Sequence, residues 1–179
     1  MKYILTTFLL LSVFLAGAQR FKTYKSHIRF FSDAPMEDIE AVNKQASSIV
    51  NVETMDVVMV IPITAFEFKK KLMQDHFNEN YLESDKYPRA VFKGKLIGWD
   101  GSEKKAVARA KGSLEIHGVT QEVEIAGDLT FTNDELELAS VFMIRLADYD
   151  IKIPKAVFYK IAEEVEVTAT FNYKPYEKD

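Results

Sequence analysis

The chain contains no cysteine, and this absence excludes several kinds of chemistry at once. A protein without thiols has no disulfide, no thiolate metal site, no cysteine nucleophile and no cysteine for lipid attachment. The fold must then be held by its hydrophobic core without covalent cross-links, and a chain of 179 residues is long enough to bury a core of its own.

An excess of positive charge is also missing. The sequence has 23 Lys and Arg against 27 Asp and Glu, for a formal net charge of −4. Because a negatively charged protein mildly repels phosphate backbones, we expect no nucleic-acid partner.

Histidine is scarce, and its three copies are far apart in the sequence, at His27, His76 and His117. The close His pairings of metal and zincin motifs do not occur, and neither does a G-x-S-x-G turn. We therefore expect no metal site, no cofactor, no catalytic residue and no enzymatic activity. The strand pattern described below places His27 and His117 on the outside of the protein.

No apolar run reaches the ~20 residues that a membrane-spanning helix needs. The N-terminus instead has a short positive start at Met1-Lys2, an apolar stretch from Ile4 to Leu15, and small residues at Ala16-Gly17-Ala18. This pattern predicts a signal peptide at residues 1–18, followed by one periplasmic or secreted domain at residues 19–179 with no membrane span after cleavage. A membrane anchor or a buried first helix is the alternative.

From Phe21 onward, apolar and polar residues alternate with a period of two, which is typical of strands with one buried face. We predict eight strands, at about residues 24–30, 46–52, 57–66, 89–99, 106–117, 123–131, 136–146 and 157–173. Turns are predicted at Asp100-Gly101, at 118–121 and at Asn133-Asp134.

The alternation also predicts which side chains face inward. These are the even positions of 106–117 and 136–146 and the odd positions of 123–131 and 165–173. In the first strand, Tyr24 shares a face with Ser26, Ile28 and Phe30. Residues 57–66 are apolar on both faces, so their inward set stays open.

One segment departs from the strand pattern. Residues 68–77 are rich in helix formers and predict a short helix, with Lys69–Lys71 on its wet face. A weak attraction of these lysines to anionic head groups is the alternative function for them. The aromatic residues Phe77, Tyr81 and Tyr87 that follow are expected to plug one end of the fold.

Short turns between so many strands favour an all-β, eight-stranded antiparallel barrel with one short helix, because closure removes the exposed sheet edges. A two-layer sandwich is the rival architecture. Pro62 cannot donate to a ladder, so a bulge is expected there.

Two stretches of the sequence resemble the signatures of the YceI-like polyisoprenoid-binding family. The first is Phe77–Pro88 with Ala90-Val91-Phe92-Lys93-Gly94, and the second is Gly112–Val123, which contains a Gly-Val-Thr turn. The chain differs from the family pattern where Ile28-Arg29-Phe30-Phe31 lacks a terminal His, and where Leu146 and Asp150 replace an Arg and a Gly. The resemblance implies a lipocalin-like barrel that holds a long isoprenoid chain, with no established catalysis.

Small residues on the predicted inner face indicate a roomy interior, namely Ser26, Ala46, Ser48, Ala106, Ala108, Ala110, Gly112, Gly127 and Ala169. The alternative is that these residues lie opposite aromatic side chains in a full, dry core. Glu163 is the one charged residue at an inward position, where a local bulge would turn it outward.

We predict that a long-chain polyisoprenoid or similar lipid is carried or sequestered in an apolar lumen. The predicted ligand-binding residues are Ile28, Phe30, Val50, Val52, Phe92, Leu96, Ala108, Ala110, Leu114, Leu129, Phe142, Ile144, Val165 and Val167. The alternative functions are a protein-interaction or stress-related barrel with a filled core and no ligand, and an enzyme acting on a lipid in the same cavity.

Overall fold

The computed structural model describes residues 20–33, 38–101, 103–132, 134–153 and 162–176. The predicted signal peptide at residues 1–18 lies outside these ranges. Among the described residues, no helix is both long enough and apolar enough to cross a membrane.

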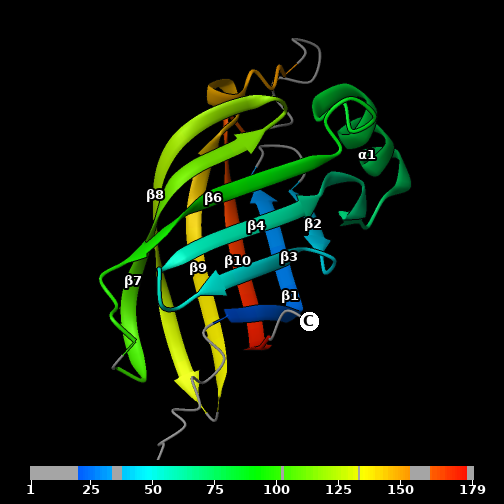
Figure 1. The fold of residues 1–179 in the computed structure, drawn as a ribbon. Coiled ribbons are helices and arrows are strands. Elements are labelled where there is room, and N and C mark those ends of the chain that lie inside the picture. The colour runs from blue at the N-terminus through cyan, green and yellow to red at the C-terminus, as the bar shows by residue number, and fades with distance from the viewer. Residues whose placement is uncertain (1–19, 34–37, 102, 133, 154–161, 177–179) are drawn as a thin grey trace, which may run out of the picture.

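In the described part of the chain, eight antiparallel strands close into a barrel (Figure 1). They are β1 (Arg20–Ser32), β3 (Ser47–Asn51), β4 (Asp56–Pro62), β6 (Arg89–Ile97), β7 (Lys105–Ile116), β8 (Val119–Thr132), β9 (Glu135–Arg145) and β10 (Glu164–Pro175). Each pairs with the next in this order, and pairing of β10 with β1 closes the ring. Two short strands, β2 (Ile39–Asn43) and β5 (Glu67–Phe68), extend the sheet beside β1. The predicted barrel is confirmed, and the continuous ring is incompatible with a sandwich.

The helical residues lie at one end of the barrel (Figure 1). Helix α1 (Lys71–His76) continues into a π-helical turn, η2 (Phe77–Tyr81), and two short 3₁₀ turns occupy η1 (Ile63–Ala65) and η3 (Leu146–Tyr149). The predicted helix over 68–77 therefore starts later. Phe68 belongs to β5 because it pairs with Ala41 of β2.

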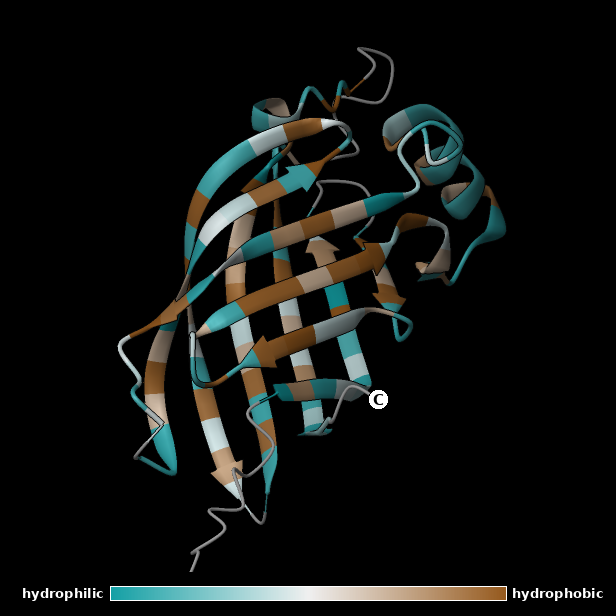
Figure 2. Ribbon diagram, in the orientation of Figure 1, coloured by the Kyte–Doolittle hydropathy of each residue, from teal (hydrophilic) through white to brown (hydrophobic). Residues whose placement is uncertain are grey.

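The inward and outward alternation is confirmed on the long strands, and Figure 2 shows the resulting bands of hydropathy. On β7, Ala108, Leu114 and Ile116 are buried, whereas the odd-numbered Arg109 and Lys111 are exposed. On β4, the undecided strand, Val57 is fully buried and Val58 is 40% exposed. The odd positions of β4 thus face the interior.

Tyr24 does not share the inner face with Ser26, so that prediction is wrong. The register of β1 against β10 shifts between Thr23 and Lys25, and the extra residue turns the Tyr24 side chain outward, where it is 51% exposed. A β-bulge of this kind reverses the alternation on its two sides. Phe21 is consequently buried at an odd position, and Ser26 at an even one.

The predicted turn at 118–121 and the predicted bulge at Pro62 need correction. The β7–β8 turn is made by His117 and Gly118, both with positive φ, and β8 begins directly at Val119. Gly118 is required because a Cβ at this position would overlap the ring of Tyr87. Pro62 needs no bulge, because it is the last residue of β4, opposite Arg89 of β6, and pairing of β4 with β3 has already ended at Val60.

Among the described residues, the last strand begins at Glu164, after Ala162 and Glu163, whereas residues 157–161 of the predicted strand lie outside the described ranges. Glu163 precedes the strand and its side chain is exposed, so it does not point into the interior.

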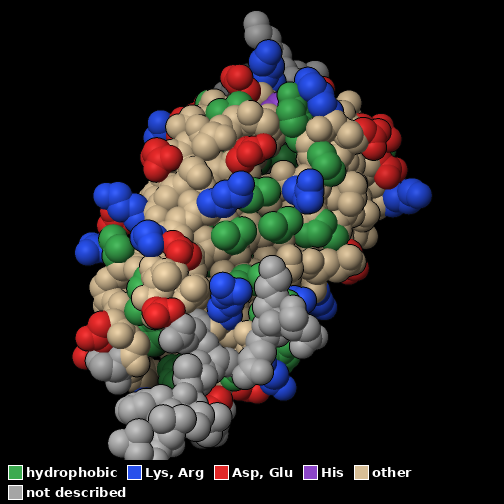
Figure 3. Space-filling model, viewed as in Figure 1, with side chains coloured by type: hydrophobic (Ala, Val, Ile, Leu, Met, Phe, Trp, Pro, Cys, Tyr) green, Lys and Arg blue, Asp and Glu red, His purple; other side chains and the backbone are tan. Residues whose placement is uncertain are grey.

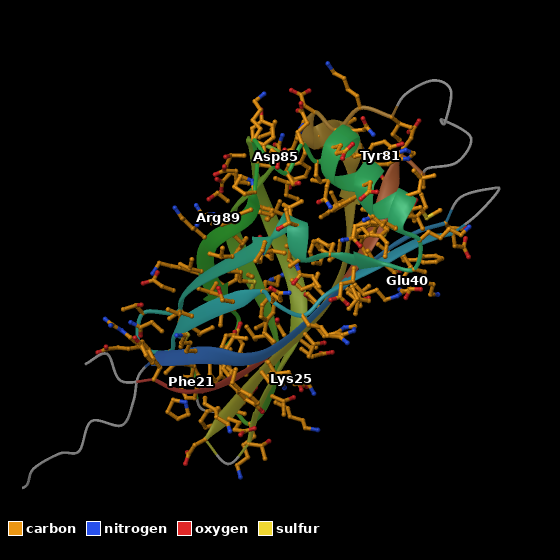
Figure 4. The ribbon with its side chains drawn as sticks, turned by 90° about the vertical axis from the view of Figure 1, so that its right-hand side faces the viewer. Phe21, Lys25, Glu40, Tyr81, Asp85 and Arg89 are labelled. Atoms are coloured by element: carbon orange, nitrogen blue, oxygen red, sulfur yellow. The ribbon has the colours of Figure 1, made fainter. Side chains whose placement is uncertain are left out.

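One half of the barrel is packed solid. Val50, Val57, Leu129, Leu136 and Tyr173 are each at most 1% exposed. Phe21 closes this end against Phe131 in an edge-to-face contact, with ring centroids 5.7 Å apart. Figure 4 shows Phe21 and Tyr81 toward opposite ends of the molecule. The helical segment, formed by α1 and η2, therefore covers the other half of the barrel.

The outer surface mixes charged and apolar side chains. In Figure 3 the face built by β3, β4 and β6 shows hydrophobic side chains among Lys, Arg, Asp and Glu. Ile49 and Val58 are opposite each other there and are 42% and 40% exposed.

Candidate ligand-binding cavity

A cavity of about 460 Å³ occupies the half of the barrel beneath the helical segment. Its size falls in the range of small-molecule sites. Aliphatic and aromatic residues from most of the barrel strands form its wall. The polar side chains on the wall are few, namely Ser32, His76, Tyr81, Asp128 and Ser140. Such a lining suits an apolar ligand.

Small side chains make this space. Ala108 and Ala110 of β7, Gly127 of β8 and Ala169 of β10 all line the cavity. Of the other small residues predicted inside, Ser48 lies in the filled half, where it accepts a 3.0 Å hydrogen bond from the Tyr173 hydroxyl. Both sequence interpretations are therefore correct, each for one half of the barrel.

The structure brings most of the predicted ligand-binding residues together in the cavity wall. These are Ile28, Phe30, Phe92, Leu96, Ala108, Ala110, Leu114, Phe142, Ile144, Val165 and Val167. Val50 and Leu129 are instead in the filled half, at 0% and 1% exposure, and Val52 packs against the core outside the cavity wall. Contact of the eleven wall residues with a ligand stays a prediction.

Sequence reasoning missed the contribution of the third barrel strand and the turn after it. Met59, Ile61 and Ile63 line the cavity. Their strand is apolar on both faces, so the pattern alone did not choose between them. The pairing of Met59 with Phe92 across β4 and β6 supplies the missing information, because opposite residues in a ladder point to the same face.

Four phenylalanines cluster in the cavity wall at the helical end, with ring centroids 5.0–5.6 Å apart. They are Phe30, Phe66, Phe68 and Phe77. The predicted aromatic plug is thus partly correct, since Phe77 and Tyr81 line the cavity. Partial burial there raises the pKa of the Tyr81 hydroxyl above its ordinary value, which keeps it neutral. Tyr87 lies elsewhere, against the ring of His117.

His117 does not lie on the outside as predicted. Its side chain is 11% exposed, and Nε2 lies 2.9 Å from a carboxylate oxygen of Glu83 while Nδ1 lies 3.1 Å from the carbonyl oxygen of Tyr149. Both partners are hydrogen-bond acceptors, and a protonated ring nitrogen can donate to the one that it faces. His117 consequently joins the β7–β8 turn to the loop before β6 and to η3.

The other histidines are exposed. His27 faces outward from β1 as predicted, and His76 is at the rim of the cavity. Within the described ranges, no group of three or more His, Cys, Asp or Glu residues is arranged to hold a metal ion.

An ion-pair network supports the strands beside the helical end. Glu40 lies 2.6 Å from Arg29 and 3.3 Å from Lys69. The hydrogen bond from Arg29, with a smaller contribution from Lys69, holds the pKa of the Glu40 carboxyl below its usual range. The Glu40 carboxylate therefore offsets part of the positive charge that Lys69, 87% exposed, presents to solvent.

A family profile described as the YceI-like domain matches residues 19–173. The chain belongs to the YceI-like family. Among curated proteins, none matches this YceI-like protein.

Several solved structures share its fold. A polyisoprenoid-binding domain from Saccharophagus degradans, implicated in plant cell wall breakdown, superposes with a TM-score of 0.76 at 12% identity, over 89% of this chain and 99% of that one. BcnA of Burkholderia cenocepacia gives 0.70 at 17% identity, over 82% and 95%. The YceI protein of Campylobacter jejuni gives 0.62 at 10% identity, over 82% and 90%.

Proposed function

We propose that this YceI-like protein is a non-enzymatic binding protein that holds an elongated apolar lipid, such as a long-chain polyisoprenoid, in its barrel cavity. The observation that carries the proposal is the 460 Å³ cavity with its nearly continuous apolar wall. The similarity in fold to a structure described as a polyisoprenoid-binding domain supports the choice of lipid.

The energetics of burial favour a long chain over a short one. Each buried CH₂ contributes about 0.8 kcal/mol, and association costs about 4 to 15 kcal/mol. A ligand burying ~20 carbons gains ~16 kcal/mol before these costs, which leaves micromolar affinity if about half is lost. No ionic anchor is needed, in agreement with the scarcity of charged side chains on the cavity wall.

Native mass spectrometry of protein from untreated cells tests this function directly. We expect a co-purifying apolar mass, and an apo mass at every preparation would contradict the proposal. A double substitution, Ala108→Phe with Ala110→Phe, fills the cavity from β7 and should abolish uptake of added geranylgeraniol. Val107→Phe is the matched control, because it adds the same ring to the outer face of the same strand, where Val107 is 71% exposed.

The same experiments address the alternative functions. A protein-interaction barrel without a ligand predicts an apo mass and no effect of the double substitution. An enzyme predicts chemical turnover of the bound lipid, which His76→Ala would reduce, since His76 is the histidine on the cavity wall.

The N-terminal pattern supports an exported location. We expect the mature protein to begin at Gln19 and to be found in the periplasm or medium. N-terminal sequencing of the fractionated protein tests this proposal, and a cytoplasmic product that retains Met1 would contradict it.

A further inference from the structure

The wall of the barrel is incomplete between β8 and β9. The ladder joins these strands only from Asp128, opposite Ala139, to Thr132, opposite Glu135. No pairing joins residues 119–127 to residues 140–145, although both stretches are fully described. Along the same length, β8 stays paired with β7 and β9 with β10. Figure 1 shows β8 bending away from β9 above their shared hairpin.

This gap has defined ends, so it is a window in the wall. At the lower end β8 and β9 are very close, because a Cβ on Gly127 would lie 2.6 Å from the carbonyl oxygen of Ala139. At the upper end the Gln121 amide donates a 2.7 Å hydrogen bond to the carbonyl oxygen of Asp148 in η3. The bond between His117 and Tyr149 reinforces this connection.

The cavity reaches the window. Asp128 and Ala139 are at outward-facing positions of their strands, and both nevertheless line the cavity. The inward side chains beside the window are partly exposed, as for Ile125, Phe142 and Ile144. On β6, β7 and β10 the inward residues Phe92, Ala108 and Val167 are buried, whereas Met59 and Ile61 of β4, across the barrel, are partly exposed like those at the window. The presence of Asp128 and Ala139 in the lining therefore places one edge of the cavity at the window.

A second opening lies beside α1, where the cavity-lining residues Leu72 and His76 are exposed. The four-phenylalanine cluster also lies in this part of the wall. Widening the window breaks no ladder hydrogen bond, since its edges are already unpaired. Val141 and Met143 beside it are 61% and 55% exposed and offer an apolar surface to a lipid chain.

We propose that the lipid enters and leaves the cavity sideways, through the window between β8 and β9, rather than through the opening beside α1. This inference rests on the proposed function, because it concerns how that function's ligand reaches its site.

The absence of cysteine allows a clean test, in which two introduced thiols bridge the window. Ala126→Cys with Val141→Cys places one outward-facing thiol on each edge, and a cleavable bis-maleimide then spans the window without filling the cavity. The readout is the rate of Nile red uptake by stopped-flow fluorescence, using the mature chain. Cross-linking should slow uptake by roughly tenfold or more, and cleavage of the linker should restore it.

Two controls are matched to this variant. Thr130→Cys with Glu137→Cys carries the same linker across the paired part of the same hairpin and should leave the rate unchanged. Lys71→Cys carrying a bulky maleimide adds bulk to α1 beside the other opening, at an exposed residue outside the cavity lining, and should have little effect. If the first pair perturbs folding by circular dichroism, Glu124→Cys with Met143→Cys bridges the window one step further along.

Each outcome decides between the proposals. Normal uptake with the window cross-linked would overturn the window and leave lipid binding intact, and slow uptake in the Lys71 adduct would assign entry to the opening beside α1. Failure of the unmodified protein to take up either Nile red or geranylgeraniol at any concentration would instead overturn the proposed function itself.

Discussion

Tyr173 and Ser48 form the buried polar contact of the filled half of the barrel. The Tyr173 side chain is fully buried, and its hydroxyl donates to Ser48 over 3.0 Å. Buried polar groups cost free energy when they lose their partner. Removal of the Tyr173 hydroxyl oxygen alone is therefore expected to lower the stability of the protein.

Tyr173→Phe should lower the free energy of unfolding by about 1–2 kcal/mol, because it leaves the Ser48 hydroxyl buried without its partner. Adding Ser48→Ala removes the second hydroxyl and should recover part of the loss. Urea unfolding of the two variants measures both effects. Equal or greater loss in the double variant would show that the hydrogen bond is not the cause.

The burial of Tyr173 should also make the stability of the protein sensitive to high pH. Burial raises the pKa of its hydroxyl well above the ordinary value of 10.0. Above about pH 10 the unfolded chain loses this proton while the folded chain keeps it, so stability falls as pH rises. Below that pH the contribution is fully present. Urea unfolding at roughly pH 8 and roughly pH 11 measures this effect. The free energy of unfolding should fall less between the two pH values in Tyr173→Phe than in the parent protein. An identical loss in both would argue against this origin.

At the scale of single elements, the β6–β7 pair depends on two facing glycines. Gly94 and Gly112 are opposite each other in the ladder, and a Cβ on Gly112 would overlap the carbonyl oxygen of Lys93 and the Cα of Gly94. These two strands can approach so closely only without side chains.

Gly112→Ala should therefore destabilise the protein by about 1–3 kcal/mol, as overpacking does in a core. Lys111→Ala, at the exposed neighbouring position, should change stability by no more than about 0.5 kcal/mol. Thermal unfolding followed by circular dichroism distinguishes them. If the alanine at 112 is tolerated as well as the one at 111, the close approach is not needed.

The element boundaries show where sequence patterns fail. The alternation of apolar and polar residues identified most of the barrel strands, and the apolar run at 57–66 identified β4 without its inward face. The bulge at Tyr24 and the start of the helix at Lys71 depend on partners in β10 and β2. No pattern within those segments contains that information.

For the whole molecule, binding should appear as stabilisation. A ligand present at 100 times its dissociation constant adds about 2.7 kcal/mol, which raises Tm by about 5–10 °C for a protein of this size. Differential scanning calorimetry with geranylgeraniol should show this shift. The protein with Ala108→Phe and Ala110→Phe should not respond, and an equal shift in that variant would place binding outside the cavity.

The amino-acid sequence alone favoured a barrel over a sandwich and determined the inward side chains of most strands and the family that the chain resembles, because these properties follow from local alternation and short motifs. Only the tertiary structure decided that one half is solid and the other hollow. Ala108 lines the cavity and Ser48 contacts Tyr173 because of the side chains that other strands place opposite them. The separation of β8 from β9 likewise results from how far each strand follows its other neighbour, which is a property of the closed sheet and of no single segment.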